Sequence, residues 1–244
     1  MSISRCCFLA TQKFFMVGKT LLNKAKQRTT MNVIISLHDP NYQPLADLTW
    51  NQNKLLYAEK NGYAAECKTN NFKGGVSIGY EKIWFIKELM ADHPEYEWIW
   101  WTGTDTLVTN FNVKIEDRID NNYHFIIATD CNGINADSFL VRNSPEGRAY
   151  IDFIWDNHEE YEQDGWKEQR CIISNLEKFK DIIKIVPQRD LNAYNYALYP
   201  HCQPYDKSEN YGQWQPGDWL IHWPGIDLFR RLQLASFYMQ HVVK

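Results

Sequence analysis

The sequence predicts an α/β fold in which a mostly parallel, Rossmann-like central sheet is flanked by helices. Residues 32–37 (NVIISL) form a β-branched apolar run that is typical of a buried strand. Segments with strand and helix character then alternate, and this order favours parallel strands joined by helical crossovers. The 244 residues contain no linker rich in Pro, Gly or Ser and no internal repeat, so we expect one main domain.

Residues that stop helices set the elements of the first half of the chain. Asn61-Gly62 should end a helix, because glycine adopts the left-handed conformation that closes helices. Pro94 bars the continuation of a second helix, and the short aromatic run WIWW that follows is typical of a buried strand. The expected elements are strands at 32–37, 63–68 and 98–101, helices at 46–60 and 80–92, and a Gly-rich loop at 72–79. The apolar face expected for the first helix consists of Leu48, Leu55, Leu56 and Tyr57.

The second half of the chain contains further strands and three helices. Ser144-Pro145 predicts a helix start, because serine caps helices and proline suits their first turn. We expect strands at 125–129, 139–142, 182–186 and 219–222, and helices that begin at 145 and span 167–178 and 227–240.

The charge of the chain is unevenly distributed. Residues 1–30 carry six basic side chains and no acid, so the net charge of −4 leaves −10 on residues 31–244. An acidic body repels the phosphate backbone, which excludes nucleic acid as the expected partner. We interpret residues 1–30 as a peripheral extension, and a membrane-surface helix with acylated Cys6-Cys7 is the alternative. The expected location is the cytoplasm, with a Golgi or membrane-peripheral location as the alternative.

Cysteines and aromatic residues each allow two interpretations. The six cysteines form no CxxC pair and no metal-ligand spacing, which favours reduced, mostly buried thiols over disulfides. The ten Trp, fourteen Tyr and twelve Phe residues form either a large aromatic core or stacking platforms for sugar rings. For Trp98, Trp100 and Trp101 we favour the core.

The loop after Trp101 is the first place to look for chemistry, because functional loops lie beyond the carboxyl ends of parallel strands. It reads Thr102-Gly103-Thr104-Asp105. A carboxylate here, joined by a distant histidine, suits a divalent cation such as Mn²⁺ or Mg²⁺. Such a cation can neutralise the charge that grows on a diphosphate leaving group.

Five blocks of the sequence resemble, in order, the motifs of glycosyltransferase family 34. The first resembles the family's WIWW-x-D-x-D segment, and together the blocks span most of residues 31–226. They are residues 98–110 (WIWWTGTDTLVTN), 132–143 (NGINADSFLVRN), 166–169 (WKEQ), 186–194 (VPQRDLNAY) and 217–225 (GDWLIHWPG).

The resemblance implies a GT-A fold over residues 31–244. It also implies an enzyme that moves a sugar from a UDP- or GDP-sugar donor to a saccharide hydroxyl and retains the anomeric configuration. Asp105 falls on the second Asp of the family's DxD motif, and His222 falls on the histidine that completes the metal site. Gln169 and Asp137 fall near the reacting face of the sugar, as candidate catalytic residues. The candidate donor- and substrate-binding residues are Lys82, Thr104, Asp105, Asn135, Glu168, Gln188 and Gly225.

Two departures from the family pattern bear on the metal. Gly103 stands where the family has its first Asp, and Asp137 stands where it usually has Gly. The loss of one carboxylate should weaken the binding of the metal, and Asp137 could supply a replacement charge. A site that works without metal is the alternative. The alternative function is a non-catalytic protein of the same fold that binds sugar nucleotides or carbohydrates.

Overall fold

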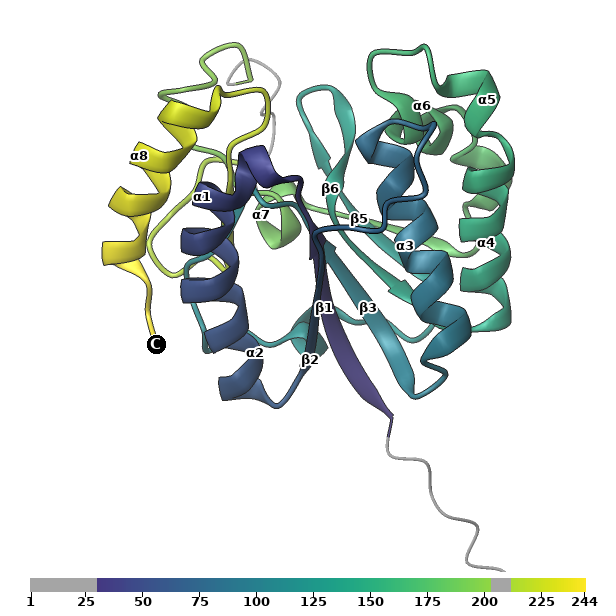
Figure 1. Cartoon of the computed structure of the whole chain (residues 1–244), viewed down its shortest axis with the longest axis horizontal. Helices are drawn as coiled ribbons and strands as arrows, with labels where there is room; N and C mark the ends of the chain where they lie inside the picture. The colour runs from purple at the N-terminus through teal and green to yellow at the C-terminus, as the bar shows by residue number, and fades with distance from the viewer. Residues whose placement is uncertain (1–29, 203–211) are drawn as a thin grey trace, which may run out of the picture.

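A six-stranded sheet in the order β2-β1-β3-β6-β5-β7 runs through the described part of the molecule (Figure 1). We describe it from a computed structural model that covers residues 30–202 and 212–244. The strands are β1 (Met31–Leu37), β2 (Ala64–Lys68), β3 (Tyr96–Thr102), β5 (Phe125–Asp130), β6 (Gly133–Arg142) and β7 (Ile183–Val186). Among the described strands of this sheet, β6 alone is antiparallel to its neighbours, so the predicted mostly parallel sheet is confirmed.

A second, two-stranded sheet joins the middle of the chain to its C-terminal part. It pairs β4 (Thr106–Val108) with β8 (Leu220–His222), and Thr106 lies opposite His222. The backbone N–H of Trp223 donates to the carbonyl of Asp105 at 3.0 Å. The end of β8 is therefore fixed beside the turn that follows β3.

Helices cover both faces of the central sheet (Figure 1). In the view of Figure 1, α3, α4, α5 and α6 lie on one side of the sheet, and α1, α2 and α8 lie on the other. Their bounds are α1 (Gln43–Ala46), α2 (Leu55–Asn61), α3 (Ile78–Asp92), α4 (Pro145–Asp156), α5 (His158–Tyr161), α6 (Lys167–Ser174), α7 (Gln188–Leu191) and α8 (Leu228–Tyr238). Short 3₁₀ turns lie at Pro40–Tyr42, Ile115–Arg118, Glu177–Phe179 and Met239–His241.

The aromatic strand β3 contributes to the core on both faces of the sheet. Because side chains alternate along a strand, Trp98 and Trp100 pack against the α2 side while Trp101 packs against the α3 side. Trp100 stacks on Trp219 with ring centroids 4.2 Å apart and donates a hydrogen bond to Ser138 Oγ. The interpretation of these tryptophans as core residues is confirmed.

The first helix differs from the prediction in its winding and in the face that it buries. Residues Asp47–Lys54 (η2) form a π-helical stretch between α1 and α2, and Gly62 ends the helix with φ 74°, as predicted. Leu55 and Leu56 are exposed, so their expected place in the core is wrong. In a π-helix the hydrogen bonds join residues five apart, so each turn contains more residues than a turn of α-helix. Side chains four positions apart therefore lie on one face. The buried face instead contains Thr49, Trp50, Asn53, Lys54, Tyr57 and Ala58.

Two other boundaries differ from the prediction. The helix expected at 167–178 ends at Ser174, and the 3₁₀ turn Glu177–Phe179 follows it. Strand β6 begins at Gly133 rather than at 139. The polar residues at its start gave no strand signal, but they pair with the end of β5, from Asp130↔Gly133 to Ala128↔Asn135.

The cysteine prediction is wrong for one pair. Cys131 and Cys202 form a disulfide, although 71 positions separate them. The fold brings together the turn between β5 and β6 and the loop that precedes residue 203, a proximity that no local spacing could indicate. Cys67 and Cys171 are free, as expected.

In the ranges 30–202 and 212–244, no helix combines the length and the apolar character that a membrane crossing requires. The interpretation of residues 1–30 as a peripheral extension, with its Cys6-Cys7 alternative, falls on residues outside the description except for Thr30.

The Trp100–Trp219 stack should be a major source of stability. We expect Trp100→Ala to lower the free energy of unfolding by about 3–5 kcal/mol, because it leaves a cavity and removes the hydrogen bond to Ser138. Chemical denaturation followed by circular dichroism would measure this. Trp166→Ala is the matched control, because Trp166 is 39 % exposed. Equal losses in both variants would contradict the proposed role of the stack.

Candidate active site

Polar side chains of η2 hold the turn that carries Asp105 in place through hydrogen bonds. Thr49 Oγ1 donates to the carbonyl of Thr104 at 2.7 Å. Asn53 exchanges two hydrogen bonds with the backbone of Val108, as a neighbouring strand would. Lys54 Nζ donates to the carbonyls of Gly103 and Thr106 at 2.9 and 2.8 Å. These contacts give the buried backbone groups of the turn side-chain partners, in addition to the bonds from Thr106 N and Oγ1 to the carbonyl of Gly103.

Lys54 is a fully buried cation at the base of this turn. Burial lowers the pKa of Lys54 to about 7, although the nearby charge of Asp105 opposes this shift. Its role is structural, because both of its hydrogen bonds fix main-chain carbonyls on either side of Asp105.

The carboxylate of Asp105 lies between an arginine and a histidine. Arg231 Nη2 is 2.8 Å from Oδ2, and His222 Nε2 is 3.5 Å from Oδ1. Burial alone would raise the pKa of Asp105, but the adjacent His222 and Arg231 lower it well below its usual value. Asp105 is therefore ionised at physiological pH, with Oδ2 held by Arg231 and Oδ1 directed toward His222.

His222 has one nitrogen in use and one available. The side chain is 0 % exposed, and Nδ1 lies 2.6 Å from Oδ1 of Asn192. An amide oxygen only accepts, so the neutral ring carries its proton on Nδ1 and leaves a lone pair on Nε2. Nε2 has no hydrogen-bond partner within the described residues. A buried histidine oriented in this way is the form that metal sites use.

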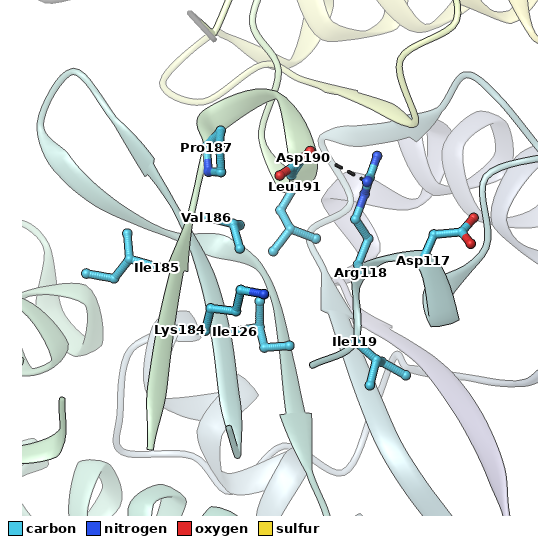
Figure 2. A pocket seen from close by; sticks show the side chains of 10 residues that line it. All are labelled: Asp117, Arg118, Ile119, Ile126, Lys184, Ile185, Val186, Pro187, Asp190 and Leu191. Carbon is cyan, nitrogen blue, oxygen red and sulfur yellow. Dashed lines mark ion pairs between the residues drawn. The ribbon is translucent and has the colours of Figure 1, made fainter. Parts of the chain in front are cut away.

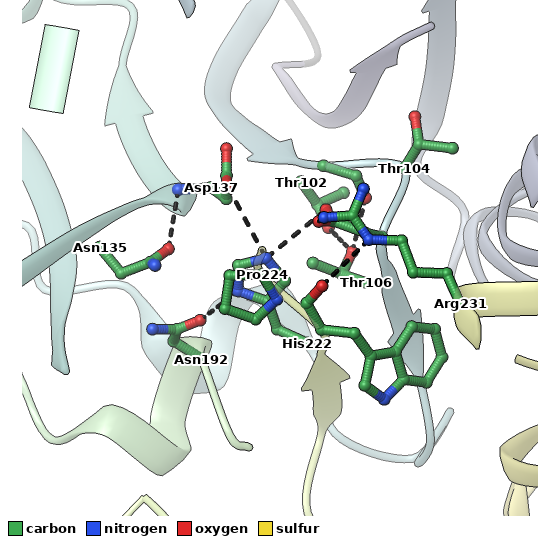
Figure 3. Close-up of polar contacts among 12 residues, drawn as sticks. Thr102, Thr104, Thr106, Asn135, Asp137, Asn192, His222, Pro224 and Arg231 are labelled. Atoms are coloured by element: carbon green, nitrogen blue, oxygen red, sulfur yellow. Dashed lines mark hydrogen bonds and ion pairs between the residues drawn. The ribbon is translucent and has the colours of Figure 1, made fainter. Parts of the chain in front are cut away.

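Asp137 completes a cluster of possible ligands around His222, as Figure 3 shows. Its Oδ2 is 3.7 Å from His222 Nε2, and its side chain is 44 % exposed. One ligand atom from each of Asp105, Asp137 and His222 lies within 4.8 Å of the others. The structure thus brings together both predicted metal ligands, Asp105 and His222, and one of the two predicted catalytic residues.

The predicted residues Lys82 and Glu168 form a buried ion pair beside this cluster. Lys82 Nζ is 2.7 Å from Glu168 Oε1, 3.4 Å from Asp137 Oδ1, and donates to the carbonyl of Ala136 at 2.7 Å. Burial lowers the pKa of Lys82, but the charges of Glu168 and Asp137 more than offset this and raise it. Lys82 therefore stays charged and joins α3 to β6 and α6.

A hydrogen-bond network supports the start of β6. Asn135 Oδ1 accepts from the backbone N–H of Asp137 at 2.9 Å, and Asn135 Nδ2 donates to Asp130 and Tyr194. The hydroxyl of Tyr194 donates to Asp130 Oδ2 at 2.8 Å, and Asn192 donates to that hydroxyl. The predicted residue Asn135 thus links the backbone of Asp137 to Asn192, which orients His222.

The remaining predicted residues have varied surroundings. Gln169 Oε1 accepts from the backbone N–H of Ala136 at 3.0 Å, so Gln169 borders β6 one residue from Asp137.

Thr104 Oγ1 donates to the carbonyl of Leu37, toward the end of β1. The contacts found for Gln188 are with Tyr196 and Gly212 rather than with the cluster. Gly225 lies in the turn after β8, with φ 67°.

Three residues of the site were missed by sequence reasoning. Arg231 comes from α8, outside the five motif blocks, and only the fold brings it to Asp105. Lys54 lies inside the helix expected at 46–60, and a lysine carries no apolar signal that would mark it as buried. Asn192 lies inside the block 186–194, so its position there was the one available signal.

A separate cavity of about 260 Å³ lies along the edge strand β7 (Figure 2). An ion pair between Arg118 and Asp190, 3.6 Å apart, lies in its wall. None of the residues that line it belongs to the Asp105–Asp137–His222 cluster.

Lys54 should be required for the stability of the Asp105 turn. We expect Lys54→Met to lower the free energy of unfolding by about 2 kcal/mol or more, because the buried carbonyls of Gly103 and Thr106 each lose a hydrogen bond from Lys54. The pKa of Lys54 is about 7 when folded and its ordinary value is 10.5, so between these pH values the unfolded chain holds the extra proton. Wild type therefore gains at most about 1.4 kcal/mol per pH unit as pH rises through this range, and the variant lacks that gain.

Urea unfolding of both proteins at pH 7 and pH 9 would test this, with the difference between them expected to widen at pH 9. Lys60→Met is the control, since Lys60 is exposed and donates to Asn112 on the surface. A difference that does not change with pH would show that Lys54 is not buried as described.

Comparisons of sequence are consistent with the motifs. The profile of the galactosyl transferase GMA12/MNN10 family matches residues 31–122 and 119–232. An uncharacterized alpha-1,2-galactosyltransferase of Schizosaccharomyces pombe is 28 % identical over 221 residues, 73 % of this chain and 56 % of the relative. The probable alpha-1,6-mannosyltransferase MNN10 of Saccharomyces cerevisiae is 22 % identical over 199 residues, 66 % of this chain and 50 % of the relative. The chain thus spans about half the length of these curated relatives.

Comparisons of structure show the GT-A fold. The crystal structure of a glycosyltransferase involved in the glycosylation of the major capsid of PBCV-1 superposes with a TM-score of 0.69 at 17 % identity, and the match covers 85 % of this chain and 99 % of that one. The galactosyltransferase LgtC gives a TM-score of 0.55 at 14 % identity, over 84 % and 95 % of the two chains. With its GT-A fold and a profile match over most of its length, this chain belongs to the galactosyl transferase GMA12/MNN10 family.

Proposed function

We propose that the protein transfers a sugar from a UDP- or GDP-sugar to a hydroxyl of a saccharide acceptor, with a divalent cation at Asp105 and His222. The observation that carries this proposal is the buried Nε2 of His222, which faces Asp105 Oδ1 at 3.5 Å and has no hydrogen-bond partner among the described residues. A buried polar atom without a hydrogen-bond partner is costly unless something binds it.

The spacing of these atoms suits Mn²⁺ or Mg²⁺. His222 Nε2 and Asp105 Oδ1 lie 3.5 Å apart, so both atoms could reach one ion placed between them. Carboxylate oxygen and imidazole nitrogen also form a donor set that Mn²⁺ accepts. When bound, the cation would neutralise the charge that develops on the departing diphosphate.

The proposed reaction retains the anomeric configuration. The bond between the anomeric carbon and the phosphate oxygen breaks, and the acceptor oxygen forms a bond to the same carbon on the leaving-group face. The acceptor proton passes to a phosphate oxygen, so the products are a glycosylated acceptor and a nucleoside diphosphate. Gln169 would lie near the opposite face of the sugar and steady the positive charge that grows there.

The other predicted residues would shape the donor site. Lys82 and Glu168 form a buried charge pair that positions β6 and α6, the two elements between which we place the donor sugar. Gln169 and Asn135 both bind the backbone next to Asp137, so they fix this edge of the site. The names of the relatives, galactosyl- and mannosyltransferases, favour a hexose as the transferred sugar.

Donor binding tests the proposal. We expect calorimetric titration of the full chain with UDP-glucose, UDP-galactose, UDP-xylose and GDP-mannose to show binding of one donor with Mn²⁺ and much weaker binding with chelator. Asp105→Asn should lower transfer or donor hydrolysis by at least about a hundredfold, because the substitution removes the charge that holds the metal.

Asp190→Asn is the matched control, since Asp190 is also paired with an arginine but lies on the separate cavity. Unchanged turnover in Asp105→Asn would overturn the assignment. Donor binding without turnover on any saccharide acceptor would favour the non-catalytic alternative, for which Gly103 is the motivating feature.

The disulfide bears on where the protein works. Disulfides persist in oxidising compartments, so Cys131–Cys202 favours the Golgi or membrane-peripheral alternative over the cytoplasm. We expect alkylation of the purified, unfolded protein without reductant to leave Cys131 and Cys202 unmodified, with Cys67 and Cys171 as the labelled internal standards. Mass spectrometry of the peptides would measure this, and full labelling of Cys131 would contradict it.

A further inference from the structure

We propose that Asp137 supplies the carboxylate that position 103 lacks, so that the metal site of this chain consists of Asp105, Asp137 and His222. This inference rests on the proposed function and deepens it, because it assigns the third ligand. It replaces the catalytic role that the motif resemblance implied for Asp137. Three features of the site support this assignment: the pairing of two strands, the space around Gly103 and the charged partners of the cluster.

Positions 103 and 137 lie opposite each other across one rung of the β3–β6 ladder. The register pairs Trp101 with Phe139 and Thr102 with Ser138, and the next pair in this antiparallel register is Gly103 with Asp137. A backbone hydrogen bond from Gly103 N to Asp137 O, at 2.9 Å, continues the ladder to this pair. Opposed residues of an antiparallel pair direct their side chains to the same face, so either position can place a carboxylate at the same point.

The space around Gly103 is already occupied by the ligands of the proposed site. A Cβ at position 103 would lie 2.8 Å from Asp105 Oδ1 and 3.8 Å from Asp137 Cβ. A side chain at 103 would therefore enter the region where the two carboxylates lie and would press on Asp105. This pair of positions thus carries one side chain in total. Position 103 has none, and position 137 supplies the acid.

Each of the three side chains is held by one atom and has a second atom free to bind. Asp105 is held through Oδ2 by Arg231, and His222 is held through Nδ1 by Asn192. Asp137 Oδ1 faces Lys82 at 3.4 Å. The other atoms, Asp105 Oδ1 and Asp137 Oδ2, lie 3.5 and 3.7 Å from His222 Nε2. Partners that fix ligands in this way are characteristic of metal sites.

Asp137 is the acid near the site that lies farthest from its basic partner. Arg231 lies 2.8 Å from Asp105, and Lys82 lies closer to Glu168 (2.7 Å) than to Asp137 (3.4 Å). Asp137 is therefore the carboxylate that is least engaged by a basic side chain and most open to a cation. The partly exposed side chain of Asp137 also gives the cluster an open side toward solvent.

Moving the carboxylate from position 137 to position 103 tests the proposal. The probe is MnCl₂ alone, and binding to the full chain is measured by the loss of the free Mn²⁺ signal in electron paramagnetic resonance. We expect Asp137→Gly and Asp137→Asn to weaken Mn²⁺ binding by at least about tenfold. We expect the double variant Gly103→Asp, Asp137→Gly to recover most of the loss. Gly103→Asp alone should not strengthen binding, because the side chains at 103 and 137 would then compete for the same point of the site.

Asp152→Asn is the matched control for the loss of a partly exposed carboxylate paired with lysine, because Asp152 is 47 % exposed and pairs with Lys87. It should bind Mn²⁺ as wild type does. Asp137→Asn keeps the shape of the side chain, so it decides the question even if the glycine variants unfold.

The outcomes separate this inference from the proposed function. Mn²⁺ binding that is equal in wild type and Asp137→Asn would overturn the role of Asp137 and leave a metal at Asp105 and His222. No Mn²⁺ binding by wild type would remove the metal from the proposed function, and the inference would fall with it. Suppose that Asp137→Asn loses Mn²⁺ binding and the folded double variant does not regain it. This result would overturn the idea that a carboxylate at 103 and one at 137 can replace each other.

Discussion

The candidate site depends on the hold that η2 has on the turn after β3. Thr49, Asn53 and Lys54 bind the backbone on both sides of Asp105, from the carbonyl of Gly103 to the amide of Val108. The residues of this turn are buried, so their backbone groups need hydrogen-bond partners from the protein itself. The helix supplies the partners, so the position of Asp105 is set by main-chain contacts rather than by its own carboxylate.

This arrangement leaves the carboxylate of Asp105 free to interact with charged groups. Because the turn needs no help from Asp105, the side chain can be shared between Arg231 and His222. The short sheet β4–β8 fixes the second of these partners, since Thr106 lies opposite His222. Arg231 comes from α8, so three separated segments converge on one acidic group.

Much of the fold could be predicted from the sequence, because apolar runs and stop residues signal their elements locally. The strand at Trp98–Trp101 and the stop at Gly62 are examples. The winding of η2 could not be predicted in this way, since residues such as Leu55 and Leu56 suggest an α-helical apolar face that the π-helical stretch rotates toward solvent.

The candidate site also contains residues that the sequence indicated and residues that it did not. Motif resemblance indicated Asp105 and His222, and the structure places them together. Arg231 and Lys54 lie outside the motifs, and their roles depend on contacts between distant segments. The Cys131–Cys202 disulfide was missed for the same reason, because a separation of 71 positions carries no local pattern.

That disulfide gives the chain a covalent topology that the ribbon alone does not reveal. Residues 131–202 form a closed ring that contains Asp137, Glu168, Gln169 and Asn192, whereas Lys82, Asp105, His222 and Arg231 lie outside it. The site is thus assembled where a ring meets the two arms of chain that leave it. In the unfolded chain the ring cannot extend fully, so the ring residues search a smaller volume for one another than the residues of the arms do.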